Sequence, residues 1–277
     1  MTGTKIGLIG HPVSHSKSPL IHSYWIRKHG LNGSYTLVDL ACEALESGIK
    51  KIKADGFRGF NVTVPHKVAL LELCDEVDEL ARVVGAVNTV TIEKGRLIAT
   101  NTDVFGFIEN IKSHAPDFDF TAGPAVVLGA GGAARAVVQG LLQEGVPEIL
   151  LSNRTAAKAD ALIETSSQPA KIALLGWSSG ESGKALKEAN LIVNTTSLGM
   201  TGKPKLEIDL SLLNPKALVH DIVYAPLMTE LLITARKQGN PIVTGIGMLL
   251  HQARPAFSRW HGIMPEVTDE LTEIVTR

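Results

Sequence analysis

The sequence predicts an α/β fold in two domains, the second of which is built on a parallel sheet. Three observations lead to this prediction. The chain has 277 residues, more than one compact core usually holds. Short apolar runs alternate with helical stretches along most of the chain. One apolar run is followed at once by a glycine cluster and an alanine- and valine-rich helix, which is typical of a doubly wound sheet.

The first hundred residues are predicted to alternate strands and helices. Short apolar or alternating runs indicate strands at Lys5–Ile9, Ser34–Asp39, Gly59–Val64, Ala86–Ile92 and Arg96–Ala99. Helical spacing indicates helices at Pro19–His29 and Leu45–Ala54, and Pro65 is expected to open another. For the first helix we expect Ser18 as the N-cap, with Pro19 at the first helical position and Gly30 closing the helix.

The rest of the chain carries shorter, more continuously apolar runs. These indicate strands at Ala125–Leu128, Glu148–Leu151, Lys171–Leu174, Leu191–Asn194, Leu218–Ile222 and Pro241–Val243. Strands that are apolar on both faces belong to a parallel sheet covered by helices on both sides. We therefore place the first domain at residues 1–103 plus 246–277, and the second domain at residues 104–245.

Composition excludes several classes of function. The formal net charge of -1 gives no reason to expect a nucleic acid or an anionic membrane as partner. Cys42 and Cys74 lack the close spacing of a zinc or redox pair, which favours reduced thiols and a cytoplasmic location. No run approaches the ~18 apolar residues of a membrane span. His11, His15 and His22 have no accompanying cysteine or carboxylate cluster, so we expect no metal site.

The glycine cluster predicts a dinucleotide-binding loop. Gly129-Ala130-Gly131-Gly132-Ala133-Ala134 fits the pattern G-x-G-x-x-G/A between a strand and a helix. Gly129 permits a tight turn, Gly131 lets the backbone approach a pyrophosphate, and Ala134 keeps helix and strand close. The helix N-terminus offers amide donors and a partial positive charge to phosphates. The alternative is an ordinary glycine turn in an α/β protein.

The residues after the next strand indicate which dinucleotide is bound. Enzymes that use NAD usually carry an acidic residue there, which binds the ribose 2′-hydroxyl. This sequence has Asn153-Arg154-Thr155 and then Lys158, with no carboxylate. Guanidinium and ammonium groups attract a 2′-phosphate, so the segment predicts NADP as the cofactor. The alternative is a capping Asn or Thr beside two solvated basic residues.

The run Asn61-Val62-Thr63-Val64-Pro65-His66-Lys67 is the first candidate for chemistry. Asn61 and Thr63 point to one side of a strand end, and Lys67 is expected in the first turn of the next helix. A cation there opposes the helix dipole, which suggests a functional reason for it and helps proton exchange. The alternative is a surface lysine lying over the helix end.

Further polar residues precede predicted helices. Asp103 ends Asn101-Thr102-Asp103 and is either an N-cap or a functional carboxylate. Neighbouring strands could bring Asn88 and Asp103 to the same sheet edge as Asn61, although spacing alone does not prove it. Ser16 and Ser18 could bind a carboxylate at a helix start, and the alternative is capping by Ser18 alone.

Together these segments resemble the shikimate dehydrogenase family. Eight runs occur in the order of the family's motifs: His15-Ser16-Lys17-Ser18-Pro19, the Asn61–Lys67 run, Gly85-Ala86-Val87-Asn88-Thr89, Asn101-Thr102-Asp103, Gly129-Ala130-Gly131-Gly132-Ala133, Asn153-Arg154-Thr155, Tyr224-Ala225-Pro226-Leu227 with Thr229, and Gly247-Met248-Leu249-Leu250-His251-Gln252. The resemblance spans about residue 6 to residue 256. Ser23 and Thr244 depart from the family, which often has Asn and Asp there.

The resemblance implies reversible reduction of 3-dehydroshikimate to shikimate with NADPH, on the route to chorismate and the aromatic amino acids. It implies an N-terminal α/β substrate domain, completed by the C-terminal helices, and a Rossmann-type NADP-binding domain. Lys67 and Asp103 would be the catalytic pair, with Lys67 either an acid–base group or an electrostatic anchor. The substrate would be bound by Ser16, Ser18, Asn61, Thr63, Lys67, Asn88, Asp103, Tyr224 and Gln252. The cofactor would also meet Glu79, Ile222 and Gly245.

Three rival functions remain to be weighed. A quinate/shikimate dehydrogenase using NAD is disfavoured by Arg154 and by the missing acidic residue. A non-catalytic ligand sensor of the same fold would not need Lys67 and Asp103, yet both are present. An unrelated NADP reductase that shares only the dinucleotide domain leaves the first hundred residues unexplained. The expected partner is therefore a small-molecule substrate, with a homodimer possible.

Overall fold

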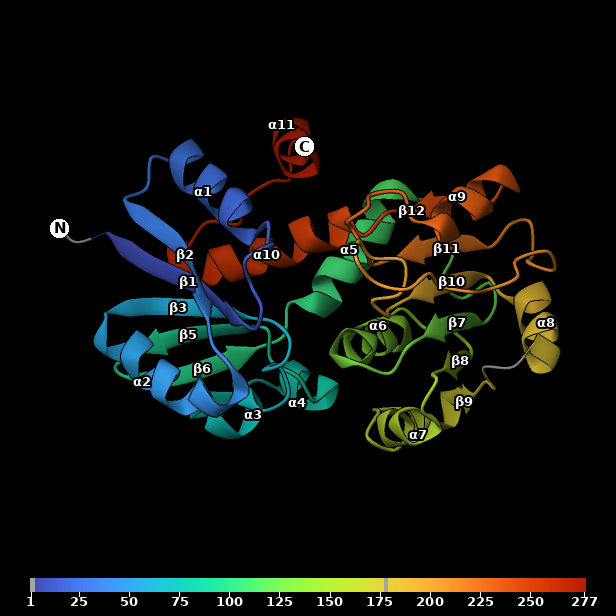
Figure 1. Ribbon diagram of the computed structural model, residues 1–277, viewed down its shortest axis with the longest axis horizontal. Coiled ribbons are helices and arrows are strands. Elements are labelled where there is room, and N and C mark those ends of the chain that lie inside the picture. The colour runs from blue at the N-terminus through green and yellow to red at the C-terminus, as the bar shows by residue number, and fades with distance from the viewer. Residues whose placement is uncertain (1–2, 177–178) are drawn as a thin grey trace. The chain divides into compact units, whose positions relative to one another are not determined.

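The computed structural model describes residues 3–176 and 179–277, and the chain divides into two compact units (Figure 1). The first unit is Met1–Asp103 with Leu249–Arg277, and the second is Val104–Met248. The chain thus returns to the first unit at Leu249, rather than at the residue 246 expected from the sequence. The reason is that Met248 is still buried in the core of the second unit.

A mixed six-stranded sheet forms the centre of the first unit, in the order β2-β1-β3-β5-β6-β4. Its strands are β1 Thr4–Gly10, β2 Gly33–Asp39, β3 Phe57–Val62, β4 Glu76–Val77, β5 Thr89–Glu93 and β6 Arg96–Thr100. Strand β1 pairs in parallel with β2 and β3, whereas β5 runs antiparallel to β3 and β6. The short β4 pairs in parallel with β6.

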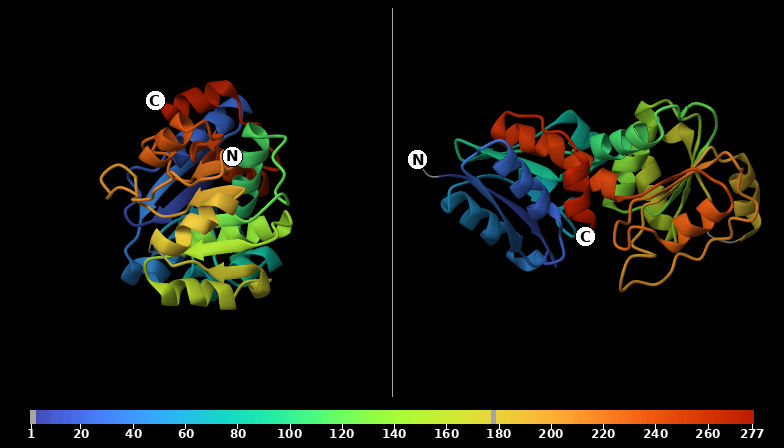
Figure 2. Two further views of the ribbon diagram at one scale, coloured as in Figure 1. Left: turned by 90° about the vertical axis from the view of Figure 1, so that its right-hand side faces the viewer. Right: turned by 90° about the horizontal axis from the view of Figure 1, so that it is seen from above.

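Helices cover both faces of this sheet (Figure 1 and Figure 2). They are α1 Ser18–Lys28, α2 Leu45–Ala54, α3 Leu70–Leu73, α4 Glu79–Val84, α10 Ile246–His261 and α11 Asp269–Thr276, with a 3-10 turn at Cys42–Ala44. Side chains alternate along β1, so Ile9 packs on the face covered by α2, α3 and α4. Ile6 and Leu8 point to the other face, where they pack against Trp260 of α10.

The second unit has a fully parallel sheet in the order β12-β11-β10-β7-β8-β9. Its strands are β7 Ala125–Leu128, β8 Ile149–Ser152, β9 Ile172–Leu174, β10 Leu191–Asn194, β11 Leu218–Asp221 and β12 Ile242–Val243. Its helices are α5 Asp103–His114, α6 Gly132–Gln143, α7 Ala156–Glu164, α8 Ser179–Glu188 and α9 Glu230–Lys237, with a 3-10 turn at Pro169–Lys171.

The strand order reverses beside β7, because the chain builds β8 and β9 on one side of it and β10, β11 and β12 on the other. Ligands of doubly wound sheets bind at the carboxyl ends of the strands at such a switch point. The predicted α/β fold of two domains, the second a Rossmann-type parallel sheet, is therefore confirmed.

Two predictions of local structure were wrong. Ser18 is the first residue of α1 rather than its N-cap, and its amide donates to the Ser16 hydroxyl at 3.2 Å. The helix expected from Pro65 begins only at Leu70 and has four residues. Two elements, β4 and α4, were not predicted, and they have two and six residues. Elements this short do not complete a pattern of periodicity. Among the helices described, none has the length and apolarity needed to cross a membrane.

Two histidines are buried without charge, one in each unit. Burial lowers the pKa of His22 to about 3, and the nearby His261 adds to the effect. Burial likewise lowers the pKa of His220 to about 3, with a smaller contribution from His114. Each ring stacks on an aromatic neighbour, His22 on Tyr35 and His220 on Phe107. Both imidazoles are therefore neutral in the folded protein at neutral pH.

We predict that the free energy of unfolding falls as the pH drops below about 6.5, the usual pKa of an exposed histidine. The unfolded chain binds these protons whereas the fold excludes them, so the loss continues down to the folded pKa of about 3. At about pH 5 each histidine costs about 2 kcal/mol, and above about pH 7 neither contributes. Urea unfolding at a series of pH values measures the effect.

The matched variant is His22→Phe, which keeps an aromatic ring against Tyr35 and removes the titrating group. Its free energy of unfolding should fall less steeply below about pH 6.5 than that of the unmodified protein, by about 1.4 kcal/mol per pH unit. Parallel curves for the two proteins would contradict the prediction.

Candidate active site

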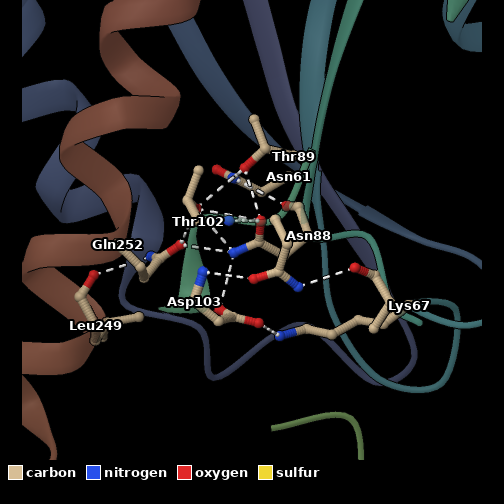
Figure 3. Close-up of polar contacts among 10 residues, drawn as sticks. Asn61, Lys67, Asn88, Thr89, Thr102, Asp103, Leu249 and Gln252 are labelled. Carbon is tan, nitrogen blue, oxygen red and sulfur yellow. Dashed lines mark hydrogen bonds and ion pairs between the residues drawn. The ribbon is translucent and has the colours of Figure 1, made fainter. Parts of the chain in front are cut away.

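Lys67 and Asp103 meet as an ion pair in the first unit (Figure 3). Lys67 Nζ lies 2.6 Å from Asp103 Oδ2, and the two side chains are 16% and 7% exposed. Lys67 comes from the turn between β3 and α3, and Asp103 is the first residue of α5. A charge-assisted hydrogen bond this short, in a place that water reaches poorly, holds both head groups firmly.

The turn that carries Lys67 is fixed by tertiary contacts. The Val87 amide donates to the Lys67 carbonyl at 2.7 Å, and His66 Nε2 lies 2.6 Å from the Leu40 carbonyl oxygen. These contacts hold the segment as a turn, so Lys67 does not sit at a helix N-terminus as predicted. The predicted effect of a helix dipole on Lys67 is therefore wrong, and the Lys67 ammonium group is paired with Asp103 instead.

Asn88 is the centre of the polar network. It is 2% exposed, and its Nδ2 donates to Asp103 Oδ1 at 2.8 Å and to Thr102 Oγ1 at 2.9 Å. Its Oδ1 accepts from the Thr102 amide at 2.8 Å and from the Thr89 hydroxyl at 3.1 Å. Gln252 of α10 lies at the edge, with Oε1 at 3.4 Å from Asn88 Nδ2. One amide thus orients the carboxylate that holds Lys67.

Asn61 joins this network through its side chain. Its Nδ2 donates to the Asn88 carbonyl oxygen at 3.2 Å and to Thr89 Oγ1 at 3.1 Å, and its Oδ1 accepts from Tyr35 at 2.7 Å. The register pairs Asn61 of β3 with Thr89 of β5, which places them side by side. The convergence of Asn61, Asn88 and Asp103, which spacing alone left open, is thus present in the fold.

The remaining predicted substrate residues come from the start of α1, from the end of β3 and from the second unit. The Ser16 hydroxyl donates to the Ser18 hydroxyl at 3.2 Å. Thr63 follows β3 and is half-buried. Within the described residues, its hydroxyl bonds to no other side chain. Tyr224 belongs to the second unit, where burial raises the pKa of its phenol.

The predicted dinucleotide loop lies between β7 and α6 in the second unit. Gly129 has a φ of +108°, and a Cβ there would lie 2.6 Å from Thr195 Oγ1. Gly131 is open, since a Cβ would meet no atom within 4 Å. Helix α6 begins after Gly131 with no side-chain cap, so its first amides keep their donors available. Ala134 is fully buried where the helix packs on the sheet. The loop therefore fits a bound pyrophosphate.

The segment after β8 presents basic groups. Asn153 Nδ2 donates to the Thr155 carbonyl oxygen at 2.8 Å, and Thr155 precedes α7 without capping it through its side chain. Arg154 and Lys158 are exposed, and in the described part of the chain neither has an ion-pair partner. No acidic residue stands between β8 and α7. These groups fit a 2′-phosphate.

Three further residues were predicted to meet the cofactor. Gly245 packs directly on the Ile222 carbonyl, so that a Cβ there would overlap it. These two residues therefore lie side by side in the second unit. Glu79 is the exposed first residue of α4 in the first unit, and its role stays a prediction. Among the described residues, no group of three His, Cys, Asp or Glu side chains could hold a metal ion.

Two buried polar groups of the structure were not predicted from the sequence, Tyr35 and Asp221. Tyr35 is buried beside Asn61, and its signal is that a buried tyrosine must find a hydrogen-bond partner. Asp221 is buried at the end of β11, where it accepts from Thr229 Oγ1 at 2.6 Å and from Asn194 Nδ2 at 3.0 Å. Burial raises the pKa of Asp221, and those hydrogen bonds oppose the shift. This carboxyl supports the loop that continues into Ile222 and Tyr224.

Comparison with known proteins agrees with this geometry. Residues 8–90 match the family described as "Shikimate dehydrogenase substrate binding domain", and residues 111–201 match "Shikimate / quinate 5-dehydrogenase". A curated protein of Rhodospirillum rubrum, named shikimate dehydrogenase (NADP(+)), is 50% identical over 272 residues, which are 97% of this chain and 95% of that protein.

Solved structures give the same result. Shikimate 5-dehydrogenase from Thermus thermophilus, in complex with NADP(H) and shikimate, superimposes with a TM-score of 0.86 at 36% identity, covering 98% of each chain. Quinate dehydrogenase from Corynebacterium glutamicum, in complex with NAD, gives 0.88 at 30% identity, covering 99% of this chain and 97% of that one. From these matches and the site described above, the chain belongs to the shikimate dehydrogenase family.

Proposed function

We propose that this protein catalyses the reversible NADPH-dependent reduction of 3-dehydroshikimate to shikimate, in the biosynthesis of chorismate and the aromatic amino acids. The observation that carries the proposal is the ion pair of Lys67 and Asp103, held by the buried amide of Asn88. Family membership adds the reaction, since the relatives are named NADP-dependent shikimate dehydrogenases.

The second unit would hold the cofactor. The loop Gly129-Ala130-Gly131-Gly132-Ala133 and the start of α6 would bind the pyrophosphate through backbone amides. Asn153, Arg154, Thr155 and Lys158 would surround the adenosine 2′-phosphate. Ile222 and Gly245 would border the nicotinamide end, with Glu79 proposed near it. When bound, NADPH supplies the hydride that reduces the ketone carbon.

Lys67 and Asp103 would control the transfer of a proton to the oxygen of the reduced ketone. As the ketone is reduced its oxygen becomes an alkoxide, and an ammonium group offers it both a proton and a positive charge. Asp103 holds Lys67 Nζ through Oδ2, while Asn88 fixes the other carboxylate oxygen. Each carboxylate oxygen has a second lone pair, so Asp103 would also accept a bond from a substrate hydroxyl.

The remaining polar groups would bind the substrate ring. Ser16 and Ser18 would hold the carboxylate through hydroxyl and amide donors at the start of α1. The hydroxyl-bearing part of the ring would be bound by Asn61, Thr63, Asn88, Tyr224 and Gln252. Both cysteines are free thiols, which supports a cytoplasmic site of action.

The test is an absorbance assay of NADPH oxidation with 3-dehydroshikimate, and of NADP⁺ reduction with shikimate. The same assay with quinate and with NAD⁺ separates the proposal from its nearest rival. We expect shikimate with NADP⁺ to give by far the highest kcat/KM. No turnover with any pair, despite measurable ligand binding, would instead favour a ligand sensor. A preference for quinate with NAD⁺ would favour the other dehydrogenase.

A further inference from the structure

Tyr35 lies on β2 and reaches across one strand to the polar network. The register pairs Tyr35 with Ile6 of β1, and Leu8 of β1 with Asn61 of β3. Because side chains alternate along a strand, Ile6 and Leu8 point to the same face of the sheet. Tyr35 and Asn61 therefore share that face, with β1 between them. The length of a tyrosine side chain spans this gap.

The Tyr35 hydroxyl donates to Asn61 Oδ1 at 2.7 Å, and both side chains are buried. Burial raises the pKa of Tyr35, so the phenol keeps the proton that it donates. Asn61 is thus held by a donor that comes from two strands away.

The orientation of the Asn61 amide depends on the Tyr35 hydroxyl. Its nitrogen is committed to the Asn88 carbonyl oxygen and to Thr89 Oγ1. Among the described residues, Tyr35 supplies the donor that Asn61 Oδ1 accepts. Without that hydroxyl, a buried carbonyl oxygen would lack a partner, and Asn61 would be free to turn its amide toward another donor.

The Tyr35 ring is itself held in place. His22 stacks on it with ring centroids 4.2 Å apart and planes inclined by 4°. His22 is 1% exposed, and neither of its ring nitrogens has a hydrogen-bond partner among the residues that the structure describes. Its contribution at this position is therefore its flat surface, which keeps the phenol ring aimed at Asn61.

We propose that Tyr35 is a positioning residue for the substrate, whose hydroxyl fixes the orientation of Asn61. This inference rests on the proposed function, in which Asn61 binds a ring hydroxyl. Lys67 and Asp103 do not depend on Tyr35 directly, because their contacts run through Asn88.

The test is Tyr35→Phe, which removes one oxygen and keeps the stacked ring. We expect the KM for shikimate to rise about tenfold, with kcat within about threefold and the KM for NADP⁺ within about twofold. Loss of a contact that binds ground state and transition state alike changes KM and spares kcat. Calorimetric titration of shikimate without cofactor should show a similar loss of affinity.

The matched control is Tyr24→Phe. Tyr24 has the same exposure, 6%, and its hydroxyl bonds to Thr268 at 2.9 Å and to Glu270 at 2.8 Å, away from Asn61. Both variants lose a buried tyrosine hydroxyl in the first unit, so a general loss of stability would act on both. Only Tyr35→Phe should raise the KM for shikimate. If Tyr35→Phe gives no soluble protein, the double variant His22→Phe/Tyr35→Phe is made instead. Its KM for shikimate is then compared with that of His22→Phe alone.

The outcomes separate the inference from the proposed function. Unchanged KM for shikimate in folded Tyr35→Phe, or an equal rise in Tyr24→Phe, overturns the inference alone. An equal rise in the KM for NADP⁺ also overturns it, because the defect would then be general. If the unmodified protein neither binds nor oxidises shikimate, the proposed function fails and the inference falls with it.

Discussion

Lys67→Ala is expected to lower kcat for shikimate oxidation by roughly a hundredfold or more. The ammonium group is paired with Asp103, and its removal takes a proton donor and a counter-charge away from the developing alkoxide. Binding of NADPH should change much less, since the proposed phosphate and adenosine contacts all lie in the second unit. Steady-state rates and a fluorescence titration with NADPH measure the two effects.

Two controls sharpen this experiment. Lys51→Ala removes another lysine of the first unit, whose 2.9 Å ion pair with Asp55 is solvent-exposed, and it should leave kcat unchanged. Thermal denaturation of Lys67→Ala shows whether the protein is folded, since the buried Asp103 carboxylate loses its ion pair and keeps the hydrogen bond from Asn88. Near-normal turnover in folded Lys67→Ala would remove this lysine from the chemistry.

Arg154→Asp is expected to have the second large effect, which is on the preference for NADPH over NADH. The ratio of kcat/KM for NADPH to that for NADH should fall on the order of a hundredfold. A hydrogen bond to a charged group is worth about 1.5–3 kcal/mol, and tenfold in affinity corresponds to about 1.4 kcal/mol. The new carboxylate also repels a 2′-phosphate while offering an acceptor to the 2′-hydroxyl of NADH.

Lys216→Asp is the matched control for this substitution. It makes the same change in net charge within the second unit, and Lys216 is exposed. It precedes β11, so it lies at the amino edge of the parallel sheet, whereas Arg154 follows β8 at the carboxyl edge. The cofactor ratio should be unchanged in Lys216→Asp. A ratio equally insensitive to Arg154→Asp would show that other groups select the cofactor.

The sequence allowed the parallel sheet to be predicted well and the first unit less completely. Runs such as Ala125–Leu128 are apolar on both faces, and only a sheet covered on both sides buries them. The turn before α3 could not be predicted, because Pro65 signals a helix start and the contacts of His66 and Lys67 with Leu40 and Val87 override it.

The site was predictable as a set of residue types, but not as a geometry. Asn61, Asn88 and Asp103 could be picked out as polar residues at the ends of strands or just before a helix. Their convergence depends on the pairing of β3 with β5 and of β5 with β6. The spacing of residues along the chain does not predict this strand register. Tyr35 was missed for the same reason, since its partner lies two strands away.

The discontinuity of the first unit has a consequence for how the chain acquires its structure during synthesis. Trp260 of α10 donates from its indole to the Val90 carbonyl oxygen at 3.1 Å and packs tightly on Gly59, so it covers strands made long before it. On the ribosome, the part of the sheet that α10 covers stays exposed until residues 249–277 have been made. The second unit is continuous in sequence and can close first, which reverses the usual N-terminal-first order.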